Sequence, residues 1–210
     1  MMKNIKSATI GRLHELAVDA VMKYGKEVVT ENDDVTIELP EPLCLECPVS
    51  IDYRLSDRSS VKESFAEAYM ENLIYGYDSE VQFEYDYHSR LFNYDGVNQI
   101  EKIINHLKEE ITTRRAVAVT WKPKVDTEKE DVPCLQWLNV DIRDDKLNMT
   151  VLFRSNDILL ALGANMYGLT GLQAYIAEKM NVECGIYRHI AVHPHIYVNR
   201  DKDELKKFGY

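Results

Sequence analysis

The chain lacks any apolar stretch long enough to cross a bilayer. Its longer runs, such as residues 158–162, fall far short of the roughly 20 residues that a membrane helix needs. Its start, MMKNIKSATI, has no apolar core followed by a small-residue cleavage site, so no secretory signal is predicted. The four cysteines are too few and too dispersed for a disulfide scaffold. These absences predict a cytoplasmic protein whose cysteines are thiols.

Basic charge is also scarce. The chain carries 25 Lys and Arg against 35 Asp and Glu, for a formal net charge of −10, and the basic residues form no stripe. Binding DNA or RNA requires many phosphates to be neutralised together, so a nucleic-acid partner is disfavoured. The charge leaves room for a mononucleotide, which needs only a few well-placed donors.

The composition is that of an ordinary globular protein, with 45% hydrophobic and 29% charged residues. A chain of 210 residues can bury one sizeable core, so a single domain spanning residues 1–210 is expected. Neither internal repeats nor low-complexity tracts occur. The one linker-like segment is the charged stretch 124–131.

Hydrophobic periodicity predicts a mixture of helices and strands without regular βαβ alternation, which favours the α+β class. Ser7 is expected to cap the first helix, and Ser60 with Glu63 to form a capping box for the second, which ends at Gly76. Helices are predicted over residues 7–24, 60–75, about 97–107 and 166–180. Strands are predicted over residues 27–30, 35–39, 49–53, 81–87, 115–121, 134–142, 147–153 and 185–192, with a hairpin turn at 144–146.

Four short segments carry more reactive and hydrogen-bonding groups than a plain core needs. Buried thiols are usually inert and paired arginines are usually solvated, so each segment alone has a purely structural explanation. Together they supply the cysteine, phosphate-binding and sugar-binding parts of a nucleotide enzyme. They are Arg114–Arg115, Val132–Pro133–Cys134, the run FRSND at 153–157 and the run HPHIY at 193–197.

The runs RRAVAVTW, VPCLQ, FRSND and HIYVN, with Asn165 before the last, resemble the thymidylate synthases and their dCMP hydroxymethylase relatives in order and spacing. The match covers roughly residues 114–199, extends weakly back through Tyr87 and 98–100, and is poor over the first 80 residues. The wording of the motifs is most similar to the archaeal branch. This resemblance implies a large mixed sheet flanked by helices. It also implies a methyltransferase of deoxyribonucleotide biosynthesis that makes dTMP from dUMP.

The resemblance makes Cys134 the nucleophile. C5 of a pyrimidine is a poor nucleophile, so a thiolate must first add at C6 and create an enolate. Free cysteine is mostly protonated at neutral pH, so a guanidinium is expected to lower its pKa. By resemblance Arg154 has that task and also binds the 5′-phosphate together with Ser155. Arg114 and Arg115 match arginines that reach the phosphate of a neighbouring subunit, which implies a homodimer with shared sites, with a monomer as the alternative.

The base and the sugar also have expected partners. A carboxamide at Asn165 offers one acceptor and one donor, complementary to uracil N3–H and O4, whereas the hydroxymethylase relatives carry Asp there. His195 and Tyr197 share one face of a strand and, by resemblance, bind the deoxyribose 3′-OH. A metal site of His189, His193 and His195 is a competing interpretation. It is disfavoured because no carboxylate or cysteine falls at ligand spacing beside it, so no metal is expected.

The remaining assignments concern proton transfer and the one-carbon carrier. Asp157 resembles the aspartate that meets the pterin ring. Tyr87, or Tyr85 if a gap is placed differently, matches the tyrosine that helps remove the C5 proton. Glu71, with Glu67 as the alternative, is the expected glutamate near O4. The carrier is methylenetetrahydrofolate or methylenetetrahydromethanopterin.

Three departures concern the half of the site that would hold the carrier. Leu135 follows the cysteine where many relatives have His, the only tryptophans are Trp121 and Trp137, and a C-terminal segment that closes over folate is not found after Tyr210. A hydroxymethylase, in which water replaces the hydride, and a non-catalytic nucleotide-binding relative are therefore kept as alternatives. The lone CxxC at 44–47 has no second pair and is expected to be two ordinary thiols.

Overall fold

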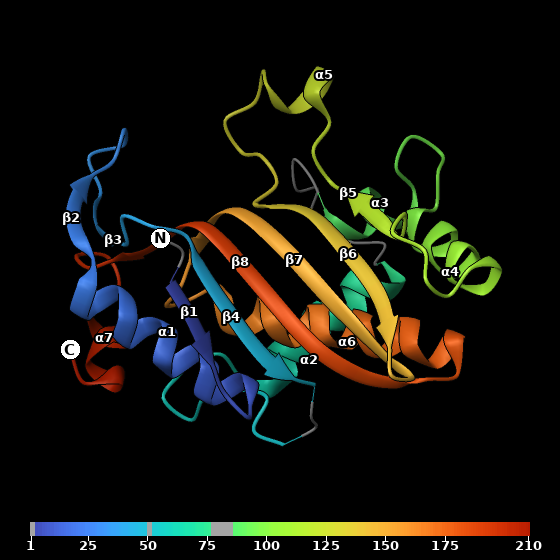
Figure 1. Cartoon of the computed structure of the whole chain (residues 1–210). Helices are drawn as coiled ribbons and strands as arrows, with labels where there is room; N and C mark the ends of the chain where they lie inside the picture. Colours follow the sequence, from blue (N-terminus) through green and yellow to red (C-terminus); the bar gives the residue numbers. More distant parts are fainter. Residues whose placement is uncertain (1–2, 50–51, 77–85) are drawn as a thin grey trace.

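The computed structural model describes residues 3–49, 52–76 and 86–210, which form an eight-stranded mixed sheet with helices packed against it (Figure 1). This is the α+β architecture expected from the sequence. Along the chain the elements are β1 (Lys3–Lys6), α1 (Ile10–Tyr24), β2 (Lys26–Val29), β3 (Val35–Glu38), β4 (Leu43–Pro48), α2 (Glu63–Tyr75), α3 (Tyr87–Phe92), α4 (Gln99–Glu109), β5 (Val117–Val119), α5 (Pro123–Asp126), β6 (Leu135–Arg143), β7 (Lys146–Asp157), α6 (Leu162–Met180), β8 (Glu183–Tyr197) and α7 (Lys202–Phe208).

The long strand β8 organises the sheet, whose order is β1-β4-β8-β7-β6-β5. β8 pairs with β7 in parallel along most of its length. On its other side it pairs with β4 over residues 186–191 and with β3 over residues 195–197, both antiparallel. β6 and β7 form the predicted hairpin, and its turn residues Asp144 and Asp145 both have positive φ, as a two-residue type I′ turn requires.

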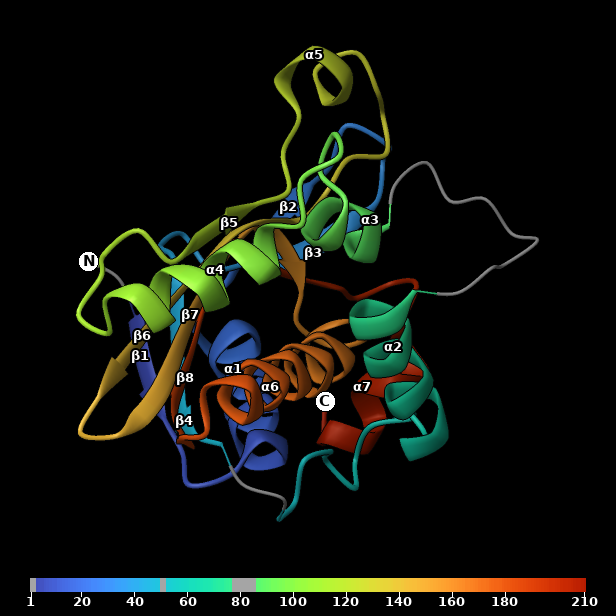
Figure 2. The ribbon, with the colours of Figure 1, turned by 90° about the vertical axis from the view of Figure 1, so that its right-hand side faces the viewer.

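Apart from the short helix α5, which stands away from the sheet on a loop, the helices lie on one side of the sheet, as the two views of the ribbon show (Figures 1 and 2). α6 is buried along most of its length, and α1 and α4 bury the apolar positions that the sequence predicted, including Leu13, Val21, Ile103 and Leu107. The opposite face carries partly exposed side chains such as Val117, Val119 and Trp137. Among the described residues, no helix combines the length and apolar character that crossing a membrane requires.

One strand prediction in the first half of the chain is wrong, and a second is contradicted only at its last two residues, 86 and 87. The strand expected at 49–53 is β4, several residues earlier, and Tyr53 lies in a turn with a φ of 44°. Its side chain is exposed, and its hydroxyl donates to Glu15, 2.7 Å away, so strand alternation does not describe its environment. Of the strand expected at 81–87, residues 81–85 lie outside the described residues. Tyr87 begins helix α3, which Asp86 caps by accepting from the Ser89 amide.

Local capping predictions were also wrong. α1 begins at Ile10 after Thr9, and Ser7 does not cap it. α2 begins at Glu63 after Lys62, while Ser60 hydrogen-bonds Glu204 of α7 through both its amide and its hydroxyl. A partner about 140 residues away in sequence thus replaces the local capping box. The sequence did not predict α7 or β1 at all.

A buried ion pair fixes α3 to the segment that precedes Cys134. Arg90 donates to both carboxylate oxygens of Asp126, at 2.9 and 2.6 Å, and to the carbonyl of Thr120. Burial opposes ionisation of Asp126, but the bonds from Arg90 and the Lys122 amide outweigh it and hold its pKa below the ordinary value. Arg90 therefore anchors the helix that begins at Tyr87.

We expect Asp126→Ala to lower the free energy of unfolding by about 3–5 kcal/mol, because it leaves the buried Arg90 guanidinium without its counter-ion. Urea unfolding measures this difference. Asp203→Ala is the matched control, because Asp203 pairs with Lys206 on an exposed surface and its loss should fall within experimental error. Equal effects of the two substitutions would contradict the anchoring role of Arg90.

Candidate active site

A cavity of about 950 Å³ opens where β7 and β8 run past the N-terminal end of α6. One wall comes from the β2–β3 hairpin, and further sides come from Tyr69 of α2, Tyr87 of α3 and the first turn of α6. Eight residues singled out from the sequence line this cavity. They are Tyr87, Cys134, Arg154, Ser155, Asp157, Asn165, His195 and Tyr197.

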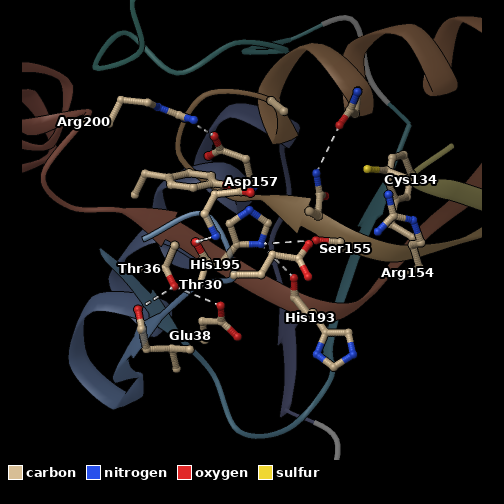
Figure 3. A pocket seen from close by; sticks show the side chains of 18 of the residues that line it. Thr30, Thr36, Glu38, Cys134, Arg154, Ser155, Asp157, His193, His195 and Arg200 are labelled. Atoms are coloured by element: carbon tan, nitrogen blue, oxygen red, sulfur yellow. Dashed lines mark hydrogen bonds and ion pairs between the residues drawn. The ribbon is translucent and has the colours of Figure 1, made fainter. Parts of the chain in front are cut away.

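Cys134 and Arg154 form one side of the cavity (Figure 3). The Arg154 amide donates to the Cys134 carbonyl at 2.8 Å, which holds the residue before β6 against β7. The Arg154 guanidinium donates through Nε to Pro133 O at 3.1 Å and through Nη2 to Val132 O at 2.9 Å. Among the described residues Nη1 has no partner, so it can meet an anion in the cavity.

The Cys134 thiol feels two opposing influences. Burial raises its pKa, the Arg154 charge lowers it, and burial prevails, so the pKa lies above its ordinary value. The expectation that Arg154 depresses the pKa is therefore correct in the sign of its contribution and wrong in the net result. The free protein holds Cys134 mainly as a thiol at neutral pH.

The parallel pairing of β7 and β8 sets the centre of the site. Its register places Ser155 beside His193 and Asp157 beside His195. The Ser155 hydroxyl lies 3.5 Å from His195 Nδ1, and His195 stacks edge-on against Tyr197 with ring centroids 5.1 Å apart. Two neighbouring strands thus present hydroxyl and imidazole groups to the same space.

Asp157 and Arg200 form the opposite side of the cavity, with His195 between them and Cys134 (Figure 3). One carboxylate oxygen of Asp157 accepts from the amides of Leu159 and Leu160, and the other accepts from Arg200 Nη2 at 2.9 Å. The carboxylate is thus fixed in direction at the corner between β7 and α6.

Asn165 projects into the cavity from the first turn of α6. Its Nδ2 donates to the Tyr69 hydroxyl at 3.0 Å, and its Oδ1 accepts from Asn156 Nδ2 at 3.2 Å. Tyr87 meets the other end of the cavity, where its hydroxyl accepts from the Leu135 amide at 3.1 Å. Both side chains are thus positioned by hydrogen bonds before any ligand binds.

Glu71 does not line this cavity. It lies in a second cavity of about 520 Å³ with Arg54, Glu178 and Cys184. α2 presents Tyr69 to the site, and residues two positions away on a helix point about 200° away around its axis. The alternative, Glu67, also stands two positions from Tyr69 and is absent from the described cavity lining.

Arg114 and Arg115 are also outside the cavity of their own chain. Both are exposed and precede the edge strand β5. Cys44 and Cys47 stand three residues apart on β4, so their side chains point to opposite faces of the sheet. Burial raises the pKa of both thiols, that of Cys47 to about 12.

Sequence patterns missed several lining residues. The β2–β3 hairpin contributes Asn32, Thr36 and Glu38, and the register of β3 with β8 sets Thr36 beside Tyr197 and Glu38 beside His195. The two strands of the hairpin were predicted, but no local pattern shows which distant strand they join. Arg200 follows the HIYVN run directly, and that position was the one available signal for it.

Comparison with known proteins identifies the family of the chain. The thymidylate synthase family model matches residues 59–207. A protein of Methanocaldococcus jannaschii, provisionally named thymidylate synthase, is 40% identical over an alignment of 213 positions that covers 97% of this chain and 95% of the relative. Relatives of the same provisional name from Methanosarcina mazei and Methanococcoides burtonii are each 36% identical and cover 92% and 97% of this chain, and 88% and 93% of their own lengths. The chain belongs to the thymidylate synthase family.

Proposed function

We propose that the protein is a thymidylate synthase that converts dUMP to dTMP, with Cys134 as the nucleophile. The observation that carries this proposal is one cavity that holds the Cys134 thiol beside Arg154, with Asn165 and the His195–Tyr197 pair facing the same space. Family members bind dUMP and use a folate-type one-carbon donor, so the substrate class agrees with the arrangement.

The lining residues offer groups for the three parts of a deoxynucleotide. Arg154 Nη1, which has no partner among the described residues, and the Ser155 hydroxyl would bind phosphate oxygens by charge-assisted and neutral hydrogen bonds. His195 and Tyr197 are placed to bind the 3′-OH. Asn165 offers one acceptor and one donor to the base, which is the pattern that uracil N3–H and O4 require.

The proposed reaction begins at the Cys134 thiol. Cys134 loses its proton, and the thiolate adds to C6 while the electron pair moves through C5 to O4. C5 would then form a bond to the one-carbon unit that the carrier supplies. Tyr87, which lines the cavity near Leu135, would help remove the C5 proton through water, and the electron pair left at C5 would release the carrier nitrogen from the transferred carbon. A hydride from the reduced carrier would complete the methyl group, and the resulting enolate electron pair would expel the thiolate from C6.

The reduced pterin would supply both the carbon and the hydride. Asp157, fixed by two backbone amides and Arg200, is the carboxylate placed to accept from the pterin ring. Both methylenetetrahydrofolate and methylenetetrahydromethanopterin carry the ring edge that such a carboxylate binds. The choice of carrier is therefore part of the test.

A two-fold dimer would complete the phosphate site. In the described part of the chain, no helix covers one face of the sheet (Figure 2). Arg114 and Arg115 are exposed and directly precede the edge strand β5. In an isologous dimer each subunit offers the same surface to the other, so arginines that miss their own cavity can serve the partner's. We propose that they bind the dUMP phosphate in this way.

We expect Cys134→Ser to lower tritium release from dUMP labelled at C5 by several orders of magnitude while dUMP binding is retained, because an alkoxide forms far less readily than a thiolate. The assay is run with both carriers, and product mass separates a methyl from a hydroxymethyl group. Cys184→Ser, a half-buried thiol outside this cavity, is the control and should keep full activity. Release above about a tenth of wild type would remove Cys134 from the mechanism.

We expect Arg154→Gln to raise the pKa of Cys134 further, because the one positive charge that lowers it is lost. The rate of iodoacetamide alkylation at Cys134, followed by peptide mass over a range of pH, measures this shift. Cys184 in the same protein is an internal control, because burial alone raises its pKa. An unchanged profile at Cys134 would show that Arg154 does not act on the thiol.

Mixing two inactive variants tests the shared site. Dimers of Cys134→Ser and dimers of Arg114→Ala/Arg115→Ala should each be inactive, whereas a mixed dimer regains one intact site. Random exchange of an equal mixture restores about a quarter of the wild-type sites. If no activity returns although mass measurements show mixed dimers, the arginines act within their own chain or not at all.

A further inference from the structure

A line of side-chain hydrogen bonds connects the core of β8 with Asn165. The Tyr187 hydroxyl lies 3.0 Å from His189 Nδ1, and His189 Nε2 lies 2.8 Å from Asn156 Oδ1. Asn156 Nδ2 then donates to Asn165 Oδ1 at 3.2 Å, and Asn165 Nδ2 donates to the Tyr69 hydroxyl at 3.0 Å. We refer to these five residues as the Tyr187–Tyr69 chain.

The Tyr187–Tyr69 chain is shielded from solvent along most of its length. Tyr187 and His189 are 0% exposed, Asn156 is 3% exposed and Asn165 is 9% exposed. Phe153 stacks on the His189 ring with centroids 4.5 Å apart and so fixes its plane. Polar groups in such surroundings must satisfy one another, because an unpaired group costs about 1–3 kcal/mol.

The ionisation states of Tyr187 and His189 determine which group donates and which accepts along the Tyr187–Tyr69 chain. Burial lowers the pKa of His189 to about 3, so the ring is neutral and has one N–H and one lone pair. Burial raises the pKa of Tyr187 well above its ordinary value, so the phenol keeps its proton. Among the described residues, His189 Nδ1 is the only hydrogen-bond partner of the phenol, so Tyr187 donates there and the ring proton lies on Nε2.

The direction passes from residue to residue. His189 Nε2–H donates to Asn156 Oδ1, which turns the Asn156 amide so that its Nδ2 faces Asn165. Asn165 must then place Oδ1 toward Asn156 and Nδ2 toward Tyr69. One lone pair on Oδ1 and one hydrogen on Nδ2 stay available to a base in the cavity.

The orientation of Asn165 decides which pyrimidine fits. A carboxamide has nearly the same shape after a half-turn that exchanges oxygen and nitrogen, but the acceptor and donor positions are exchanged. The observed orientation suits uracil, which presents N3–H and a carbonyl at C4. The exchanged orientation suits cytosine in the same pose, which presents a lone pair at N3 and an amino group at C4.

We propose that Tyr187 and His189 are positioning residues that fix the direction of the Asn165 amide through Asn156 and so make the site prefer uracil over cytosine. Neither is among the described residues that line the cavity, so both act through their neighbours. The inference rests on the proposed function, because it needs Asn165 to contact the base.

A purely structural network would behave differently. Loss of one buried hydrogen bond would then lower stability and weaken dUMP and dCMP binding alike. A positioning role instead changes the ratio of the two affinities, because removing the Tyr187 hydroxyl lets the ring proton move to Nδ1. The amides of Asn156 and Asn165 can then adopt either direction.

The test compares Tyr187→Phe with wild type by calorimetric binding of dUMP and dCMP. We expect the affinity for dCMP relative to dUMP to rise by roughly five- to tenfold, which corresponds to the free energy that one hydrogen bond typically contributes. Tyr94→Phe is the matched control, since it also deletes one tyrosine hydroxyl bond, to Trp121 O, away from the Tyr187–Tyr69 chain. It should leave the ratio unchanged.

A second measurement needs no nucleotide. The side-chain nitrogen resonances of His189 in the wild-type protein show which nitrogen carries the proton. We expect a neutral ring protonated at Nε2 at neutral pH and a mixture of both tautomers in Tyr187→Phe. A proton on Nδ1, or a charged ring, in the wild type would overturn the inference whatever the protein binds.

The outcomes distinguish a failure of the positioning role from a failure of the proposed function. If wild type prefers dUMP and a folded Tyr187→Phe protein keeps the same ratio, the positioning role is wrong and the proposed function stands. If wild type shows no preference for dUMP, the proposed function fails and the inference fails with it.

Discussion

The parallel pairing of β7 with β8 is the constraint on which the rest of the site depends. Its register sets Ser155 against His193 and Asp157 against His195, so two chain segments about 40 residues apart meet within one cavity. β6 then brings Cys134 to the same edge through its hairpin with β7. Most of the cavity is therefore fixed by backbone hydrogen bonds in a buried sheet, which suits a site that must hold several groups in place.

Short motifs could be read from the sequence because their residues are close together in the chain. Alternation on β8 put His195 and Tyr197 on one face, and the amphipathic patterns of α1 and α4 matched the residues that the structure buries. The predictions that were wrong concern residues whose contacts are made with segments distant in the sequence. Ser60 bonds Glu204 of α7, although its local sequence suits a capping box. Glu71 faces a second cavity, because packing against α6 decides the rotation of α2 and sequence alone does not.

The cysteine shows how a motif can predict that a residue lies beside Arg154 in the cavity and still give an incomplete account of its environment. Proximity to Arg154 suggested a depressed pKa, but the same packing that holds the thiol beside the guanidinium also removes water from it. The guanidinium is further engaged with two carbonyls of the preceding segment. Arg154 thus has a structural role in holding the Val132–Cys134 segment, and the thiolate must form against the cost of burial.

Base recognition raises a problem that residue identity alone does not solve. An asparagine can suit uracil or cytosine according to which way its amide points, so Asn165 by itself specifies neither. Its direction must come from a neighbour whose donor and acceptor are not interchangeable. Another amide cannot supply this, since Asn156 is as reversible as Asn165. The Tyr187 phenol can supply it, because it keeps its proton and the lone pair of His189 Nδ1 must face that proton. The neutral His189 ring then has its own proton on Nε2, so it can only donate to Asn156. Under the proposed function, the direction of the Asn165 amide is therefore set in the core of the sheet, at Tyr187, outside the set of described residues that line the cavity.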